Sequence, residues 1–155
     1  KDLTDISSQI GTLTVGGTGV AGIVGYYNHT NAGSSNPITM EGVSNFGKIE
    51  GSDLVGGIIG YRQSGDYLTL KNVANYGDIS AERAGGIVGS SGNNTIIDGA
   101  FISANVIGEF EASLTNPGRK NTNSAVNRAF YDANSTLTLG GEQKDITLIM
   151  KKLQR

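Results

Sequence analysis

The chain has 155 residues, of which 37% are hydrophobic and 24 are glycine, and it contains no cysteine. That length predicts one domain with a lean core, and the lack of cysteine excludes disulfides and thiolate chemistry. A net charge of −2 without a polybasic face argues against nucleic acid as a partner, and no apolar run approaches the roughly 20 residues of a membrane span.

Three segments recur along the chain in a fixed order, at intervals of about 30 residues. In the first segment apolar and polar residues alternate, over residues 3–6, 40–43 and 70–73. Alternation places the apolar residues on one face of a strand. The inward ladder predicted from these strands consists of Ile6, Val43 and Val73.

The second segment follows each strand and carries a glycine, or once an asparagine, before an apolar residue. The equivalent positions are Gly11, Gly47, Gly77 and Asn105. Asparagine is the residue that tolerates positive φ best after glycine, so we expect a left-handed turn at this position in every copy. The inward ladder predicted two residues later consists of Leu13, Ile49, Ile79 and Ile107.

The third segment is a glycine-rich strand, which reads AGIVG at residues 21–25, GGIIG at 56–60 and GGIVG at 85–89. We expect these glycines where the chain turns a corner or approaches its neighbour too closely for a Cβ. The third predicted inward ladder consists of Ile23, Ile58 and Ile87.

A unit of strands and turns that repeats at a fixed interval typically stacks on its neighbours. We therefore predict an all-β fold, a right-handed parallel β-solenoid (β-helix) of about four short coils. The handedness comes from the general preference for right-handed crossovers. A β-sandwich with glycine-rich turns is the alternative, but a sandwich has no reason to keep one pattern in register.

The coils are assigned to residues 1–115 and a C-terminal capping segment to residues 116–155, within a single structural domain. A surface loop is expected at residues 28–37, which are rich in Asn, Ser and Gly. The cap can include one short amphipathic helix. Its helical spacing is carried by Ile146, Ile149, Met150 and Leu153.

Two copies share a more specific pattern, Asn-aromatic-Gly-x-Ile followed by the glycine-rich strand: residues 45–49 with 56–60, and 75–79 with 85–89. This pattern resembles the GLUG repeat of large bacterial surface and secreted proteins, including the non-catalytic region of immunoglobulin A-specific metallopeptidases. Residues 129–132, followed by two glycines, are similar to the segment that closes such arrays.

The GLUG resemblance implies a bacterial, extracellular or cell-surface origin, and it implies no reaction. The chain opens at Lys1, so we expect it to be part of a longer chain whose signal and anchor lie elsewhere.

We predict no catalytic residue, no metal and no cofactor. His29 is the single histidine and lies in the expected loop, which excludes a His-Glu-x-x-His zinc site. Residues 17–22 fit G-x-G-x-x-G, with Glu41 about 20 residues downstream, but that fingerprint needs a following helix where a strand is predicted. Residues 16–19 lack the aspartate of a calcium-binding nonapeptide.

A polysaccharide-active β-helix enzyme is the second alternative, because such folds align carboxylates and basic residues on an outward ladder. The nearest candidates are Asp53, Asp66, Asp78, Glu82, Arg62 and Arg83. These side chains do not share one ladder position, so we interpret them as scattered surface charges.

The candidate binding site follows the glycine-rich strands, with Tyr26 and Tyr27 after the first and Tyr61 and Arg62 after the second. Tyrosines stacked one coil apart would form a platform for sugar rings or a peptide, bordered by Tyr67. The structural alternative is that these residues line a corner of the solenoid or pack beneath the 28–37 loop.

We therefore predict a non-catalytic module for adhesion or ligand binding. The expected partners are a host extracellular protein or glycan and other domains of a longer parent chain, without nucleic acid and without membrane insertion. A passive spacer or stalk that displays another domain is the first alternative.

Overall fold

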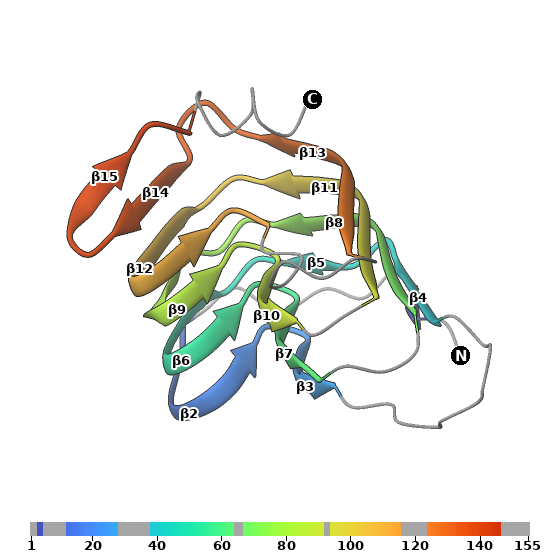
Figure 1. Cartoon of the computed structure of the whole chain (residues 1–155), viewed down its shortest axis with the longest axis horizontal. Coiled ribbons are helices and arrows are strands. Elements are labelled where there is room, and N and C mark those ends of the chain that lie inside the picture. The colour runs from blue at the N-terminus through green and yellow to red at the C-terminus, as the bar shows by residue number, and fades with distance from the viewer. Residues whose placement is uncertain are drawn as a thin grey trace.

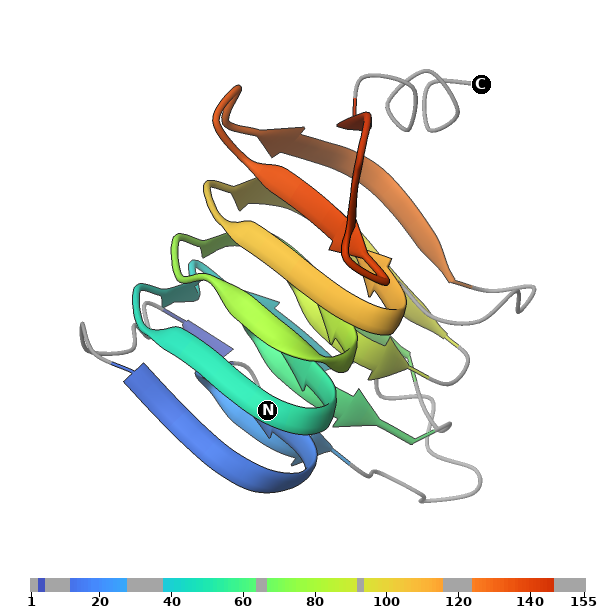
Figure 2. The same cartoon turned by 90° about the vertical axis from the view of Figure 1, so that its left-hand side faces the viewer.

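The computed structural model describes residues 3–4, 12–27, 38–63, 67–91, 94–115 and 124–146. These residues form strands and turns, with no helix among them. The part of the chain that the structure describes accordingly contains no helix that could span a membrane. Figure 1 shows the strands wound into coils, and Figure 2 shows the coils stacked along one axis.

The first sheet runs in the order β1-β4-β8-β11-β13, with β5 paired to β8 beside β4. Its strands are β1 (Leu3–Thr4), β4 (Ile38–Glu41), β5 (Ser44–Asn45), β8 (Leu68–Asn75), β11 (Thr95–Ile102) and β13 (Ala125–Tyr131). Every pair in this sheet is parallel. Each strand therefore stacks on the equivalent strand of the next coil.

The second sheet runs in the order β2-β6-β9-β12-β14-β15. Its strands are β2 (Thr12–Ala21), β6 (Lys48–Gly56), β9 (Ile79–Gly85), β12 (Asn105–Ser113), β14 (Thr136–Leu139) and β15 (Glu142–Lys144). All of them pair in parallel except β14 and β15, which form an antiparallel hairpin. The hairpin closes the C-terminal end of this sheet (Figure 1).

The third sheet is shorter, with three parallel strands in the order β10-β7-β3. These strands are β3 (Val24–Tyr27), β7 (Ile59–Arg62) and β10 (Val88–Ser91). About three turns are therefore three-sided, and β11 to β14 continue the other two sheets beyond them. The prediction of an all-β parallel β-solenoid is confirmed, whereas its right-handed sense stays a prediction.

The predicted inward ladders form the core. Val43, Val73 and Ala100 stack in the first sheet and are at most 2% exposed. Ile58 and Ile87 are fully buried where the second sheet meets the third, and Ile23 packs against them from the first coil. Ile6 and the side chain of Leu13 lie outside the described residues.

One member of the second ladder was predicted wrongly. Val106, not Ile107, pairs with Ile79 and is fully buried, whereas Ile107 is 44% exposed. The difference is explained by a hydrogen bond between coils: the backbone N–H of Asn105 donates a 2.8 Å hydrogen bond to Oδ1 of Asp78 on the neighbouring coil. That bond holds Asn105 on the outward ladder beside Asp78, so the next residue points inward.

The glycine-rich strands do approach their neighbours closely. A Cβ on Gly57 would overlap the carbonyl oxygen of Gly86, and a Cβ on Gly86 would overlap that of Leu114. In the fourth coil the equivalents of the glycine pair are Ser113, in register with Gly85, and Leu114. The glycines are thus required by space between coils, as the sequence predicted.

The left-handed turn predicted at the position of Gly47 and Gly77 was wrong. Gly77 has no positive φ, and its Cβ would instead overlap the carbonyl oxygen of Gly47. The left-handed residues of the first sheet are Gly42, Asn72 and Gly99, with φ of 67°, 51° and 86°. Glycine and asparagine alternate at this position because both tolerate positive φ.

At the C-terminal end, the Tyr131 hydroxyl donates 2.9 Å to the carbonyl oxygen of Ile146, and Ile146 packs against the core. Residues 147–155, where most of the predicted cap helix falls, lie outside the described residues. The predicted loop at residues 28–37 also lies outside them.

Candidate functional site

Two of the predicted binding residues, Tyr26 and Tyr61, form a pair on the outer face of the third sheet. They are in register on β3 and β7, with ring centroids 5.5 Å apart and ring planes tilted by 42°. Tyr26 is 53% exposed, and its hydroxyl donates 2.5 Å to Oε1 of Gln63. Ser90 takes the equivalent place on β10, so the aromatic surface spans two coils.

The next residue on each strand, Tyr27 and Arg62, faces the interior because side chains alternate along a strand. Arg62 is only 1% exposed, and its guanidinium carbon lies 5.9 Å from the centroid of the Tyr27 ring. Nη1 of Arg62 also donates 3.1 Å to Oγ1 of Thr95. The structure therefore separates these two residues from the outward tyrosine pair.

Tyr67, the remaining predicted residue, lies just before β8 in the first sheet and is 47% exposed. Its carbonyl oxygen accepts a 2.9 Å hydrogen bond from the Ile38 N–H. Tyr67 thus belongs to a different sheet from Tyr26 and Tyr61.

A second aromatic group runs along the first sheet. Phe46 and Tyr76 stack with centroids 4.8 Å apart and an interplanar angle of 4°, and Phe101 lies 5.8 Å beyond Tyr76. Phe46 and Tyr76 turn one face of each ring toward the other, so those two faces are occupied. The stack joins neighbouring coils, and Phe46 and Tyr76 each remain 42% exposed.

Two of the carboxylates considered for catalysis, Asp53 and Asp78, are engaged in contacts with neighbouring coils. Both oxygens of Asp53 accept hydrogen bonds from Arg83, and the Nε contact is 2.7 Å. This pairing holds the pKa of Asp53 below its usual range and raises the pKa of Arg83. A general acid needs the opposite shift. Asp66 lies outside the described residues.

No three potential metal-ligating side chains gather within the ranges that the structure describes.

A groove that was not predicted crosses the bends of the second sheet, with a volume of about 610 Å³. Its lining comes from β6, β9, β12 and the β14–β15 turn. The lining residues are Gly51, Ser52, Ser80, Ala81, Glu82, Ile107, Gly108, Glu109, Gly140 and Gly141. Small residues leave this space open, and β6 and β12 shift register here. Such irregularities bend strands but cannot be recognised before the register is known.

A scan against models of protein families finds no match to this chain, and searches of curated proteins and of solved structures find none either.

Proposed function

We propose that this chain is a non-catalytic, GLUG-like repeat module of a bacterial cell-surface or secreted protein, and that it binds a host protein or glycan. The observation that carries the proposal is the Tyr26–Tyr61 pair. Tyr26 is 53% exposed, and its ring lies 5.5 Å from the partly exposed ring of Tyr61 on the neighbouring coil. Exposed tyrosine combines a wide apolar face with a polar hydroxyl, a combination enriched at binding surfaces.

The rigid support beneath the pair favours binding. Tyr27 and Arg62 pack directly below it in the interior, so the β3 and β7 backbones are held from inside. A platform on a rigid strand pair loses little conformational entropy when it binds a ligand.

The test is a binding screen of the purified protein against a glycan array and host extracellular-matrix proteins. The Tyr26→Ala/Tyr61→Ala variant should lose at least about tenfold in affinity, as expected when central aromatic contacts are removed. The matched control is Tyr67→Ala/Phe130→Ala, which removes two exposed aromatics from the first sheet. That control should bind normally, and thermal melting should show that both variants are folded.

The passive spacer is the competing function, and the same screen separates the two. A wild-type chain that binds neither a glycan nor a matrix protein would favour the spacer. Binding that both variants retain would place the ligand elsewhere on the surface.

A further inference from the structure

Charges alternate from coil to coil on the first sheet. Glu41, Lys71, Asp98 and Arg128 occupy one ladder position on four successive strands, in register from β4 to β13. Nζ of Lys71 lies 3.3 Å from Oε1 of Glu41, and Nε of Arg128 lies 2.9 Å from Oδ1 of Asp98. Each charge therefore has an opposite charge beside it, as favourable cross-strand pairing requires.

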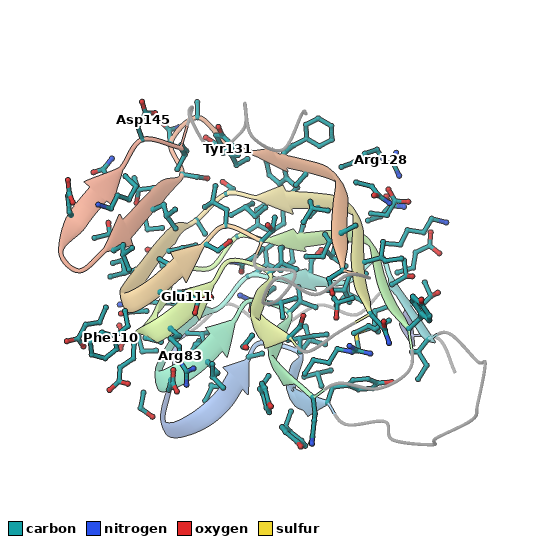
Figure 3. The ribbon with its side chains drawn as sticks, in the orientation of Figure 1. Arg83, Phe110, Glu111, Arg128, Tyr131 and Asp145 are labelled. Carbon is teal, nitrogen blue, oxygen red and sulfur yellow. The ribbon has the colours of Figure 1, made fainter. Side chains whose placement is uncertain are left out.

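The second sheet repeats this arrangement near its bends. Asp53, Arg83 and Glu111 lie on β6, β9 and β12, with Arg83 hydrogen-bonded to Asp53 and in register with Glu111. Figure 3 shows Arg83 and Glu111 on this side of the molecule. Alternation of charge between coils is thus a general feature of the solenoid surface.

Glu82 and Glu109 break the alternation. They lie on the neighbouring strands β9 and β12, and both line the groove. Within the described part of the chain neither forms an ion pair. Arg83 is close enough to interact electrostatically with Glu82 and Glu111, but its guanidinium is hydrogen-bonded to Asp53. Both carboxylates therefore border one open space, where they would attract a cationic group.

Exposed apolar side chains lie beside these carboxylates. Ile107 lines the groove and is 44% exposed, and Phe110 is 69% exposed. Figure 3 shows Phe110 projecting outward at the bend of β12. The groove itself thus carries two carboxylates and the exposed side chain of Ile107, a combination that favours a ligand with both positive charge and apolar groups.

We propose that the groove binds an extended segment of a partner protein in which lysine or arginine alternates with apolar residues. The cationic side chains lie against Glu82 and Glu109, and the apolar ones against Ile107. A neutral glycan supplies no charge to match the carboxylates. This second binding surface is separate from the Tyr26–Tyr61 pair, so either can fail without the other.

The test uses a fluorescently labelled peptide of alternating lysine and leucine. A length of about eight residues is more than enough to cross the groove. Its four neighbouring strands lie about 4.8 Å apart and together span about 14 Å, which about four to five extended residues cover at about 3.3 Å per residue. Binding is followed by anisotropy, and the contacted amides by NMR chemical shifts. We expect saturable binding that shifts the amides of residues 80–82 and 107–109 and that weakens as salt is raised from about 50 to about 500 mM.

The Glu82→Gln/Glu109→Gln variant should bind the peptide at least about tenfold more weakly, because two charge-assisted contacts are lost. The matched control, Glu41→Gln/Asp98→Asn, makes the same change in net charge on the first sheet and should bind as the wild type does. Equal weakening of both variants, or no saturable binding by the wild type, would overturn the proposal. Shifts of the same amides by a neutral hexasaccharide but not by the peptide would overturn it in favour of a glycan.

Discussion

The side-chain nitrogen of Asn45 donates a 2.7 Å hydrogen bond to the side-chain oxygen of Asn75, which joins two successive coils inside the core. Both side chains are fully buried. Each also closes its own turn, because Nδ2 donates to the carbonyl oxygen two residues later, at 2.8 Å in Gly47 and 2.9 Å in Gly77. The recurrent Asn-aromatic-Gly pattern is thus explained by a buried ladder and by the turn it closes.

The Asn75→Ala variant should therefore be less stable by about 2–3 kcal/mol, since it leaves buried polar partners of the lost amide unsatisfied. Urea unfolding at neutral pH measures the change. The control is Asn134→Ala, in the exposed turn between β13 and β14, where we expect a change below about 0.5 kcal/mol. Equal stability of the Asn75→Ala variant and the wild type would show that the ladder is not a major contributor.

Substitution of Gly86 by valine should destabilise the protein by about 3 kcal/mol or more, because the new side chain overlaps the Leu114 carbonyl oxygen and crowds Val106. Gly57→Val should behave similarly, since it would overlap the Gly86 carbonyl oxygen. Gly141→Asn is the control: nothing lies within 4 Å of a Cβ there, and asparagine tolerates its φ of 80°. Normal thermal stability of both valine variants would contradict the close approach of the coils.

Reversal of the charge at Lys71 tests the alternating ladder of the first sheet. Lys71→Glu would place three carboxylates on successive strands, and we expect a loss of about 1 kcal/mol that shrinks at high salt. Adding Glu41→Lys restores one opposite-charge pair and should recover part of the loss. A cost that is independent of salt would show that the lysine stabilises by packing rather than by charge.

The Asp53–Arg83 pair should contribute to the pH dependence of stability. The folded-state pKa of Asp53 is lowered, first by the hydrogen bond from Arg83. The stabilisation is therefore complete above the unfolded-state pKa, at about pH 4, and is lost as the pH falls through the lower folded-state value.

The Asp53→Asn variant should be less stable than the wild type at neutral pH, and the difference should narrow as the pH falls from about 4 toward about 2. Urea unfolding across this range measures it. Arg83→Met should reduce this pH-dependent contribution, because it removes the largest of the interactions that lower the pKa of Asp53 and leaves only the hydrogen bond from the Leu54 N–H. Parallel stability curves for wild type and Asp53→Asn would contradict this account.

Much of the fold could be predicted because each coil of a parallel solenoid repeats the same sequence pattern. Val43, Ile49 and Ile58 each belong to one of three inward ladders. Equivalent apolar residues recur about 30 residues later, in the next coil. The error at Ile107 arose because Asn105 was aligned with glycine as a turn residue. Its actual position depends on a hydrogen bond from its backbone N–H to Asp78, a contact between coils that periodicity does not encode.

The candidate sites were less predictable. Side chains alternate along a strand, so Tyr26 points outward and Arg62 points inward. Both had been predicted to lie on the surface. The groove depends on shifts of register in β6 and β12, which bring Glu82 and Glu109 together from different coils. Gly51 and Gly108 stand at these shifts, and glycine within a strand often accompanies a bulge. Because the chain contains 24 glycines, glycine alone does not single out these two positions.

The third sheet ends after three strands, while the first two sheets continue through two further coils. The hydrogen bonds between coils run along the axis of the stack, so a pull from one end to the other loads every junction with the same force. The junctions beyond β10 are held by strand pairs of two sheets instead of three. Under tension the C-terminal coils should therefore peel away first, while the three-sided coils that carry the tyrosine pair remain closed.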